Sequence, residues 1–130
     1  MEIINVLAAA AASWIFGAGW YMALSKPWIE AVKIEVDENG RPAGDSALPY
    51  ILSGLCMLIV AGTLRHVLAM SGITSIGGGA IAGFGVGAFF ISPWIMINNA
   101  YGMRPFKLTL IDGGYAIFGC TIMGIVLNLF

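Results

Sequence analysis

The chain has 130 residues, of which 59% are hydrophobic and 10% are charged, and its mean hydropathy is +0.90. A soluble domain usually carries about 25% charged residues, so this composition predicts a protein embedded in a lipid bilayer. The net charge is -1 and the six Lys and Arg residues are scattered, which excludes the basic surface that nucleic-acid binding requires. At about 20 residues per span, the length allows four spans and one sizeable loop in a single domain over residues 1–130.

Apolar segments of spanning length predict an all-α membrane protein with four transmembrane helices. The spans are expected at about residues 3–24, 48–70, 76–97 and 108–130. The first is expected to be a retained span and not a cleaved signal peptide. Glu2 precedes it without any Lys or Arg, and the apolar run continues to Tyr21.

Small residues recur at every fourth position of the first span. Ala9, Ser13 and Gly17 share one helical face, and small residues allow close contact between helices in a membrane. Pro27 is expected to end or kink this helix, because proline has no backbone N–H to donate.

Residues 25–47 form the only long polar connection, and they hold more than half of the charged residues. Pro27 can open a short interfacial helix that Asn39-Gly40 would end. In that helix Ile29, Val32 and Val36 would lie on one side. Alternatively, the Asn-Gly pair forms the turn of a small hairpin. The helix is our first choice.

The distribution of Lys and Arg predicts the orientation in the membrane. One side of the four spans would carry Lys26, Lys33, Arg41, Arg104 and Lys107. The other side has no Lys or Arg in its flanks or turn, apart from Arg65 near the end of the second span. The positive-inside rule therefore places the basic loops in the cytoplasm and both termini on the non-cytoplasmic side.

The third span contains an uncharged run, residues 77–90, with six glycines. Gly79, Gly83 and Gly87 recur at every fourth residue and form a strip without side chains, the pattern of a glycine zipper. Because small residues let two backbones approach in lipid, we expect this strip to lie flush against another helix. The span is expected to break near Ser92-Pro93.

Arg65, followed by His66, is the charged residue that lies deepest in a predicted span. Helical rise places it roughly 25 Å from the cytoplasmic end, whereas Asp112 is within about 6 Å of that end. The two therefore belong to opposite leaflets. Candidate partners of Arg65 are Glu2, Asn5 and Asn128. Arg65 either extends to the head groups or acts with His66 to bind an anion or relay a proton.

Asp112 is expected in the first turn of the fourth span, where a carboxylate can cap free amides, as a capping or interface residue near Arg104 or Lys107. Alternatively, it belongs to a cytoplasm-facing pocket that could bind a ligand or ion. The residues that depth alone would place around that pocket are Tyr50, Trp28, Asn98, Asn99 and Tyr101.

No nucleophile, base and orienting group occur together, so no catalytic residues, no cofactor and no enzyme activity are predicted. Cys56 and Cys120 have no zinc spacing, and one histidine cannot form a metal site by itself. Small drug exporters of four spans need a carboxylate embedded in the first span. Here Glu2 lies at the edge of that span, which counts against a protein of this class.

Two short motifs recur about half a chain apart. Pro27-Trp28-Ile29 returns as Pro93-Trp94-Ile95, and Tyr50 with Gly54 returns as Tyr115 with Gly119. These repeats would fit two tandem two-helix hairpins, although chance matches arise easily in so apolar a sequence.

Several short motifs resemble domain of unknown function family 1761, a family of small bacterial proteins with four predicted spans. They are Gly17-Ala18-Gly19-Trp20-Tyr21, Lys26-Pro27-Trp28, Arg104-Pro105, Leu110-Ile111-Asp112-Gly113-Gly114-Tyr115 and Gly124-Ile125. The resemblance implies a four-span fold in the bacterial inner membrane and supplies no activity.

Together these features predict a non-catalytic membrane protein, a tightly packed bundle that associates with itself or serves as a small subunit of a membrane complex. The alternative is a small transporter or ligand-binding protein that uses Arg65 and His66, or the Asp112 cluster.

Overall fold

The computed structural model describes residues 2–35, 38 and 47–129, and every regular element within them is helical. The elements are α1 (Glu2–Ala23), α2 (Ser25–Val32), α3 (Leu48–Met70), α4 (Ile76–Gly85), the π-helix η1 (Val86–Ile91), α5 (Ser92–Tyr101) and α6 (Phe106–Leu127). Four stretches are long and apolar enough to cross a bilayer: Ile3–Ala23, Leu48–Met70, Ile76–Tyr101 and Phe106–Leu127. This confirms the predicted all-α fold with four candidate spans.

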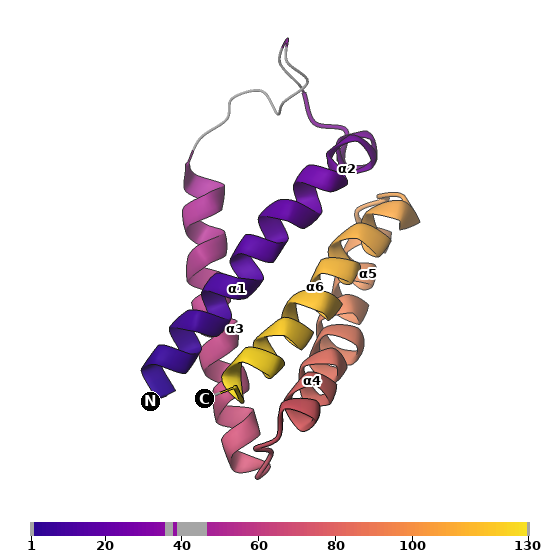
Figure 1. Ribbon diagram of the computed structural model, residues 1–130. Coiled ribbons are helices and arrows are strands. Elements are labelled where there is room, and N and C mark those ends of the chain that lie inside the picture. The colour runs from indigo at the N-terminus through magenta and orange to yellow at the C-terminus, as the bar shows by residue number, and fades with distance from the viewer. Residues whose placement is uncertain (1, 36–37, 39–46, 130) are drawn as a thin grey trace.

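Both chain ends lie at one end of the bundle, which we call the terminal end (Figure 1). The turn from α3 to α4 lies at the same end. At the opposite end, which we call the loop end, are α2 and the turn from α5 to α6. The four spans therefore alternate in direction.

The junction between α1 and α2 reflects the missing N–H of Pro27. Proline cannot donate to the carbonyl four residues earlier, which belongs to Ala23, and α1 ends at that residue. A new helix begins at Ser25 and ends at Val32, and the next residue, Lys33, adopts left-handed φ of 61°. The short helix was predicted, but its end was not: it ends before Asn39-Gly40, which lies outside the described residues.

The third span is continuous through its predicted break. Pro93 again cannot donate a backbone hydrogen bond, and the helix widens into η1 just before it. The amide of Ser92 reaches back five residues to the carbonyl of Gly87, the bonding pattern of a π-helix. The helical stretch therefore runs on to Tyr101, four residues beyond the expected end of the span near residue 97.

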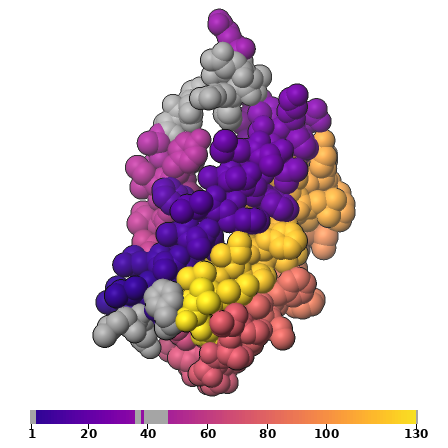
Figure 2. Space-filling view, viewed as in Figure 1, coloured from indigo at the N-terminus to yellow at the C-terminus, as the bar shows by residue number. Residues whose placement is uncertain are grey.

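The last span, α6, lies at the centre of the bundle. Figure 2 shows it filling the space between α1 and α4, and a larger share of its length is buried than in the other spans. Toward the terminal end it shares a core with α1 and α3. The buried members of this core are Ala9, Ala10, Ala61, Leu64, Leu68, Met123 and Leu127.

Candidate functional sites

The glycine strip of the third span packs against α6 of the same chain. Gly79, Gly83 and Gly87 are all buried, and a Cβ added at any of them would overlap a backbone carbonyl oxygen of α6. The facing pairs are Gly79 with Gly124, Gly83 with Cys120, and Gly87 with Ala116. Because this contact lies within one chain, the strip is not available as a surface for a second copy.

The sequence reasoning did not single out the matching face of α6. Ala116, Cys120 and Gly124 also recur at every fourth residue, which is the same small-residue signal that marked the third span. Their spacing shows a flat face, but it does not show which of the other helices lies on it.

The small face of α1 also contacts α6. Ser13 is fully buried, and its hydroxyl donates to the carbonyl of Gly119 at 2.7 Å. The Tyr115 hydroxyl donates in return to the carbonyl of Ser13 at 3.1 Å. A Cβ added at Gly17 would lie 2.6 Å from the same hydroxyl. Both small faces named from the sequence, on the first and third spans, therefore contact α6.

Asp112 connects three helices toward the loop end. The hydroxyl of Tyr21 on α1 donates to its Oδ1 at 2.7 Å, and the side chain of Trp28 on α2 also hydrogen-bonds the carboxylate. The Tyr21 ring meets Trp28 edge-on at a centroid distance of 6.2 Å, and it meets Tyr115 edge-on at 5.5 Å. We call Asp112, Tyr21 and Trp28 the carboxylate clamp.

The expected capping role of Asp112 was wrong. Because α6 begins at Phe106, Asp112 lies in the second turn, beyond the free amides of the first. The basic residues named as its neighbours have other partners. Lys107 pairs with Glu30 at 3.0 Å, and Arg104 donates to the carbonyl of Val32 at 2.8 Å.

The side chains that were grouped with Asp112 by depth lie mostly elsewhere. Trp28 is the one that hydrogen-bonds it. Asn99 donates to the Thr109 hydroxyl at 3.1 Å, Asn98 is exposed, and Tyr101 is 88% exposed. Tyr50 is exposed on α3, beside an apolar groove between α1 and α3.

Arg65 lies near the terminal end and bonds to the last residues of α6. Its Nη1 donates to the carbonyl of Leu127 at 2.8 Å, and its Nη2 donates to Oδ1 of Asn128 at 3.3 Å. The Nδ2 of Asn5 donates to the same Leu127 carbonyl at 3.3 Å. Arg65 therefore helps to satisfy the free carbonyls at the end of this helix.

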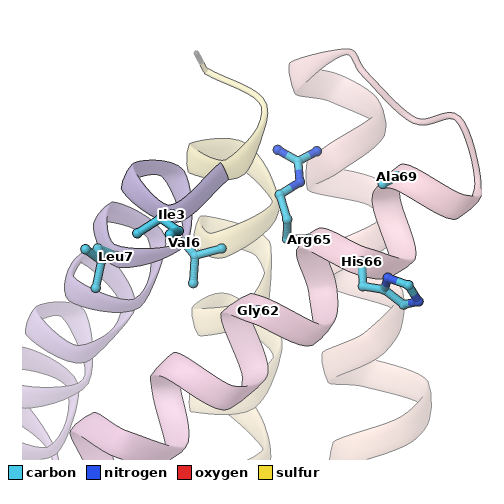
Figure 3. Close-up of a pocket in the computed structure, with 7 residues that line it drawn as sticks. All are labelled: Ile3, Val6, Leu7, Gly62, Arg65, His66 and Ala69. Atoms are coloured by element: carbon cyan, nitrogen blue, oxygen red, sulfur yellow. The ribbon is translucent and has the colours of Figure 1, made fainter. Parts of the chain in front are cut away.

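Two of the three candidate partners of Arg65 lie beside it in the structure. Asn128, named from helical rise, bonds Arg65 directly, and Asn5 shares its carbonyl acceptor. The side chain of Glu2 lies outside the described residues. His66 is exposed on the next position of α3, and its ring points away from α1 (Figure 3).

The fold and these sites define a small integral membrane protein whose helices are joined by close backbone contacts and a few buried polar side chains. The chain belongs to the family described as "Protein of unknown function (DUF1761)", whose family model matches residues 4–128. This confirms the resemblance and extends it over the middle of the chain, including Arg65 and His66. No curated protein and no solved structure matches the chain.

Proposed function

We propose that this is a non-catalytic protein of the bacterial inner membrane that acts by associating with a second copy of itself through α3. The observation that carries the proposal is one exposed line of side chains on this helix, which we call the α3 seam. Its members are Leu52, Cys56, Ile59, Thr63, His66 and Met70. They are spaced alternately by four and three residues, the spacing that keeps one face toward a partner helix along its whole length.

Polar groups distinguish the α3 seam from the rest of the apolar surface. Cys56, Thr63 and His66 are exposed along it. Away from their terminal turns, the other described spans expose apolar residues such as Ile15 and Phe89. Hydroxyl groups inside a bilayer meet no water, and polar side chains of this kind commonly hydrogen-bond across helix interfaces. A second α3 would supply both donors and acceptors to this line.

The native Cys56 allows a direct test by oxidative crosslinking in membranes. It is exposed on the α3 seam, whereas Cys120 is buried against α4. A membrane-permeant oxidant is expected to give a disulfide-linked dimer, which Cys56→Ser should abolish. The readout is the band at twice the chain mass on a non-reducing gel.

Two cysteine variants in the Cys56→Ser background provide a matched pair. Ile59 on the α3 seam and Ile15 on α1 are both 68% exposed. Ile59→Cys is expected to restore the dimer and Ile15→Cys is not. Equal crosslinking of the two variants, a larger adduct with a different protein, or no crosslinking from α3 would each contradict self-association through the seam.

The same proposal places both termini on the non-cytoplasmic side. Lys26, Lys33, Arg104 and Lys107 are all at the loop end, and this supports a cytoplasmic loop end. Met103, in the turn after α5, is 89% exposed. In a cysteine-free background, Met103→Cys is expected to react with a membrane-impermeant thiol reagent only after the cells are opened. Labelling of intact cells would contradict the orientation.

A further inference from the structure

A groove of about 370 Å³ lies between α1 and α3 near the terminal end. It is lined by Ile3, Val6, Leu7, Gly62, Arg65, His66 and Ala69. Figure 3 shows the three α1 side chains on the side of the groove opposite Gly62 and Arg65. A Cβ added at Gly62 would meet nothing within 4 Å. The groove therefore has a mostly apolar wall with open space above its glycine.

Arg65 brings positive charge to this apolar groove. Its two hydrogen bonds go to a backbone carbonyl and an amide oxygen, and its buried Nε has no hydrogen-bond partner. Among the residues that the structure describes, no carboxylate pairs with it. The carbonyl end of α6 supplies only about half of a negative charge. Within the part of the chain that the structure describes, the guanidinium thus keeps part of its positive charge uncompensated.

We propose that this groove binds an anionic phospholipid, with one acyl chain along the apolar wall and the phosphate beside Arg65. The depth of Arg65 fits this arrangement, because it lies five residues before the end of α3, about 7.5 Å along the axis. A long arginine side chain at that depth reaches the head-group layer. A lipid fits the groove better than a soluble anion does, because most of the wall is hydrocarbon and lies on a span that faces the bilayer.

The purified protein tests the proposal by native mass spectrometry with phosphatidylglycerol or phosphatidylcholine added at equal concentrations. The parent is expected to retain the anionic lipid about tenfold more than the zwitterionic one. Both lipids carry a phosphate, but the choline ammonium of phosphatidylcholine offsets the negative charge that Arg65 attracts, and the glycerol of phosphatidylglycerol does not. Arg65→Gln should bring the ratio close to one. Lys107→Gln removes an exposed cation at the loop end and should leave the ratio unchanged.

A second pair of variants tests the groove without changing any charge. Gly62→Leu fills the open space and should reduce retention of both lipids at least fivefold. Gly19→Leu places the same side chain on exposed α1, where an added Cβ also meets nothing within 4 Å, and should have no effect. If Arg65→Gln does not fold, this pair decides the question alone.

Three outcomes would overturn the lipid site. One is equal retention of the two lipids by the parent. Another is unchanged retention in Gly62→Leu. The third is binding of soluble glycerol phosphate as strongly as of phosphatidylglycerol, which would show that the acyl chain contributes nothing and that the ligand is a free anion.

Discussion

A variant with Gly83 replaced by isoleucine is expected to lose about 3 kcal/mol of stability, because overpacked side chains cost up to about that much and more where backbone must move. The Cβ of the new side chain would overlap the carbonyl oxygen of Cys120. That oxygen belongs to the backbone of α6, so the clash can be relieved only by separating two helices. Thermal unfolding in detergent, followed by circular dichroism, would measure the loss.

Gly85 provides the matched control two residues further along α4. A Cβ added there meets nothing within 4 Å, so Gly85→Ile should melt close to the parent. Because the Gly83 contact is made within one chain, the loss should appear equally in monomer and dimer fractions. Equal melting of the Gly83 and Gly85 variants would show that the contact between α4 and α6 is much looser than the structure indicates.

The spans and the leaflet of Arg65 could be predicted from the sequence because they depend on local geometry. Hydropathy identifies the spans, and a fixed rise of 1.5 Å per residue gives the depth of a side chain. Depth alone was enough to name Asn128 as a partner of Arg65. A residue on the same level of a neighbouring helix is a reasonable candidate for contact when few polar groups share that level.

Contacts that depend on how the helices are rotated could not be predicted in this way. Asn98 and Tyr50 were grouped with Asp112 by depth, yet both side chains are exposed and neither is among the hydrogen-bond partners given for its carboxylate. Tyr21, which donates to Asp112, was named in the apolar run and in a family motif but not as a partner of this carboxylate. Tyr21 reaches Asp112 only because one particular face of α1 is turned toward α6. The hydrogen bond from Ser13 to Gly119 fixes that face.

The predicted start of α6, which decided the expected role of Asp112, was also inexact. The fourth span was predicted from about residue 108, but Pro105 precedes a helix that begins at Phe106, because proline is well tolerated where amides have no partner. The two additional residues place Asp112 in the second turn, beyond the free amides of the first. A shift of two residues at a helix end thus changed the interpretation of a site.

Removal of the carboxylate of the clamp, in Asp112→Ala, is expected to lower stability by about 2 to 3 kcal/mol. The Tyr21 hydroxyl and the Trp28 indole would lose their acceptor in a half-buried site, and each unsatisfied buried donor costs about 1 to 3 kcal/mol. Asp112→Asn keeps an acceptor oxygen and should lose only about 1 kcal/mol. The measurement is again thermal unfolding in detergent.

A control at the same end of the bundle uses the exposed ion pair of Lys107 with Glu30. Glu30→Ala should change stability by less than about 0.5 kcal/mol, because exposed ion pairs contribute little. The comparison separates the loss of an acceptor for two half-buried donors from the general effect of removing a negative charge near the loop end.

A double-mutant cycle between Tyr21→Phe and Asp112→Ala distinguishes the clamp from a carboxylate kept for a ligand. In the clamp, the hydroxyl and the carboxylate stabilise the fold through one shared hydrogen bond. The stability losses of the two single variants should therefore add up to about 1.5 kcal/mol more than the loss measured in the double variant. A carboxylate retained for a ligand would instead cost stability in the empty protein, because a half-buried charge without a cation is desolvated. Asp112→Ala would then melt higher than the parent and would show no coupling to Tyr21. That result would show that Asp112 belongs to a binding site and does not stabilise the helix bundle.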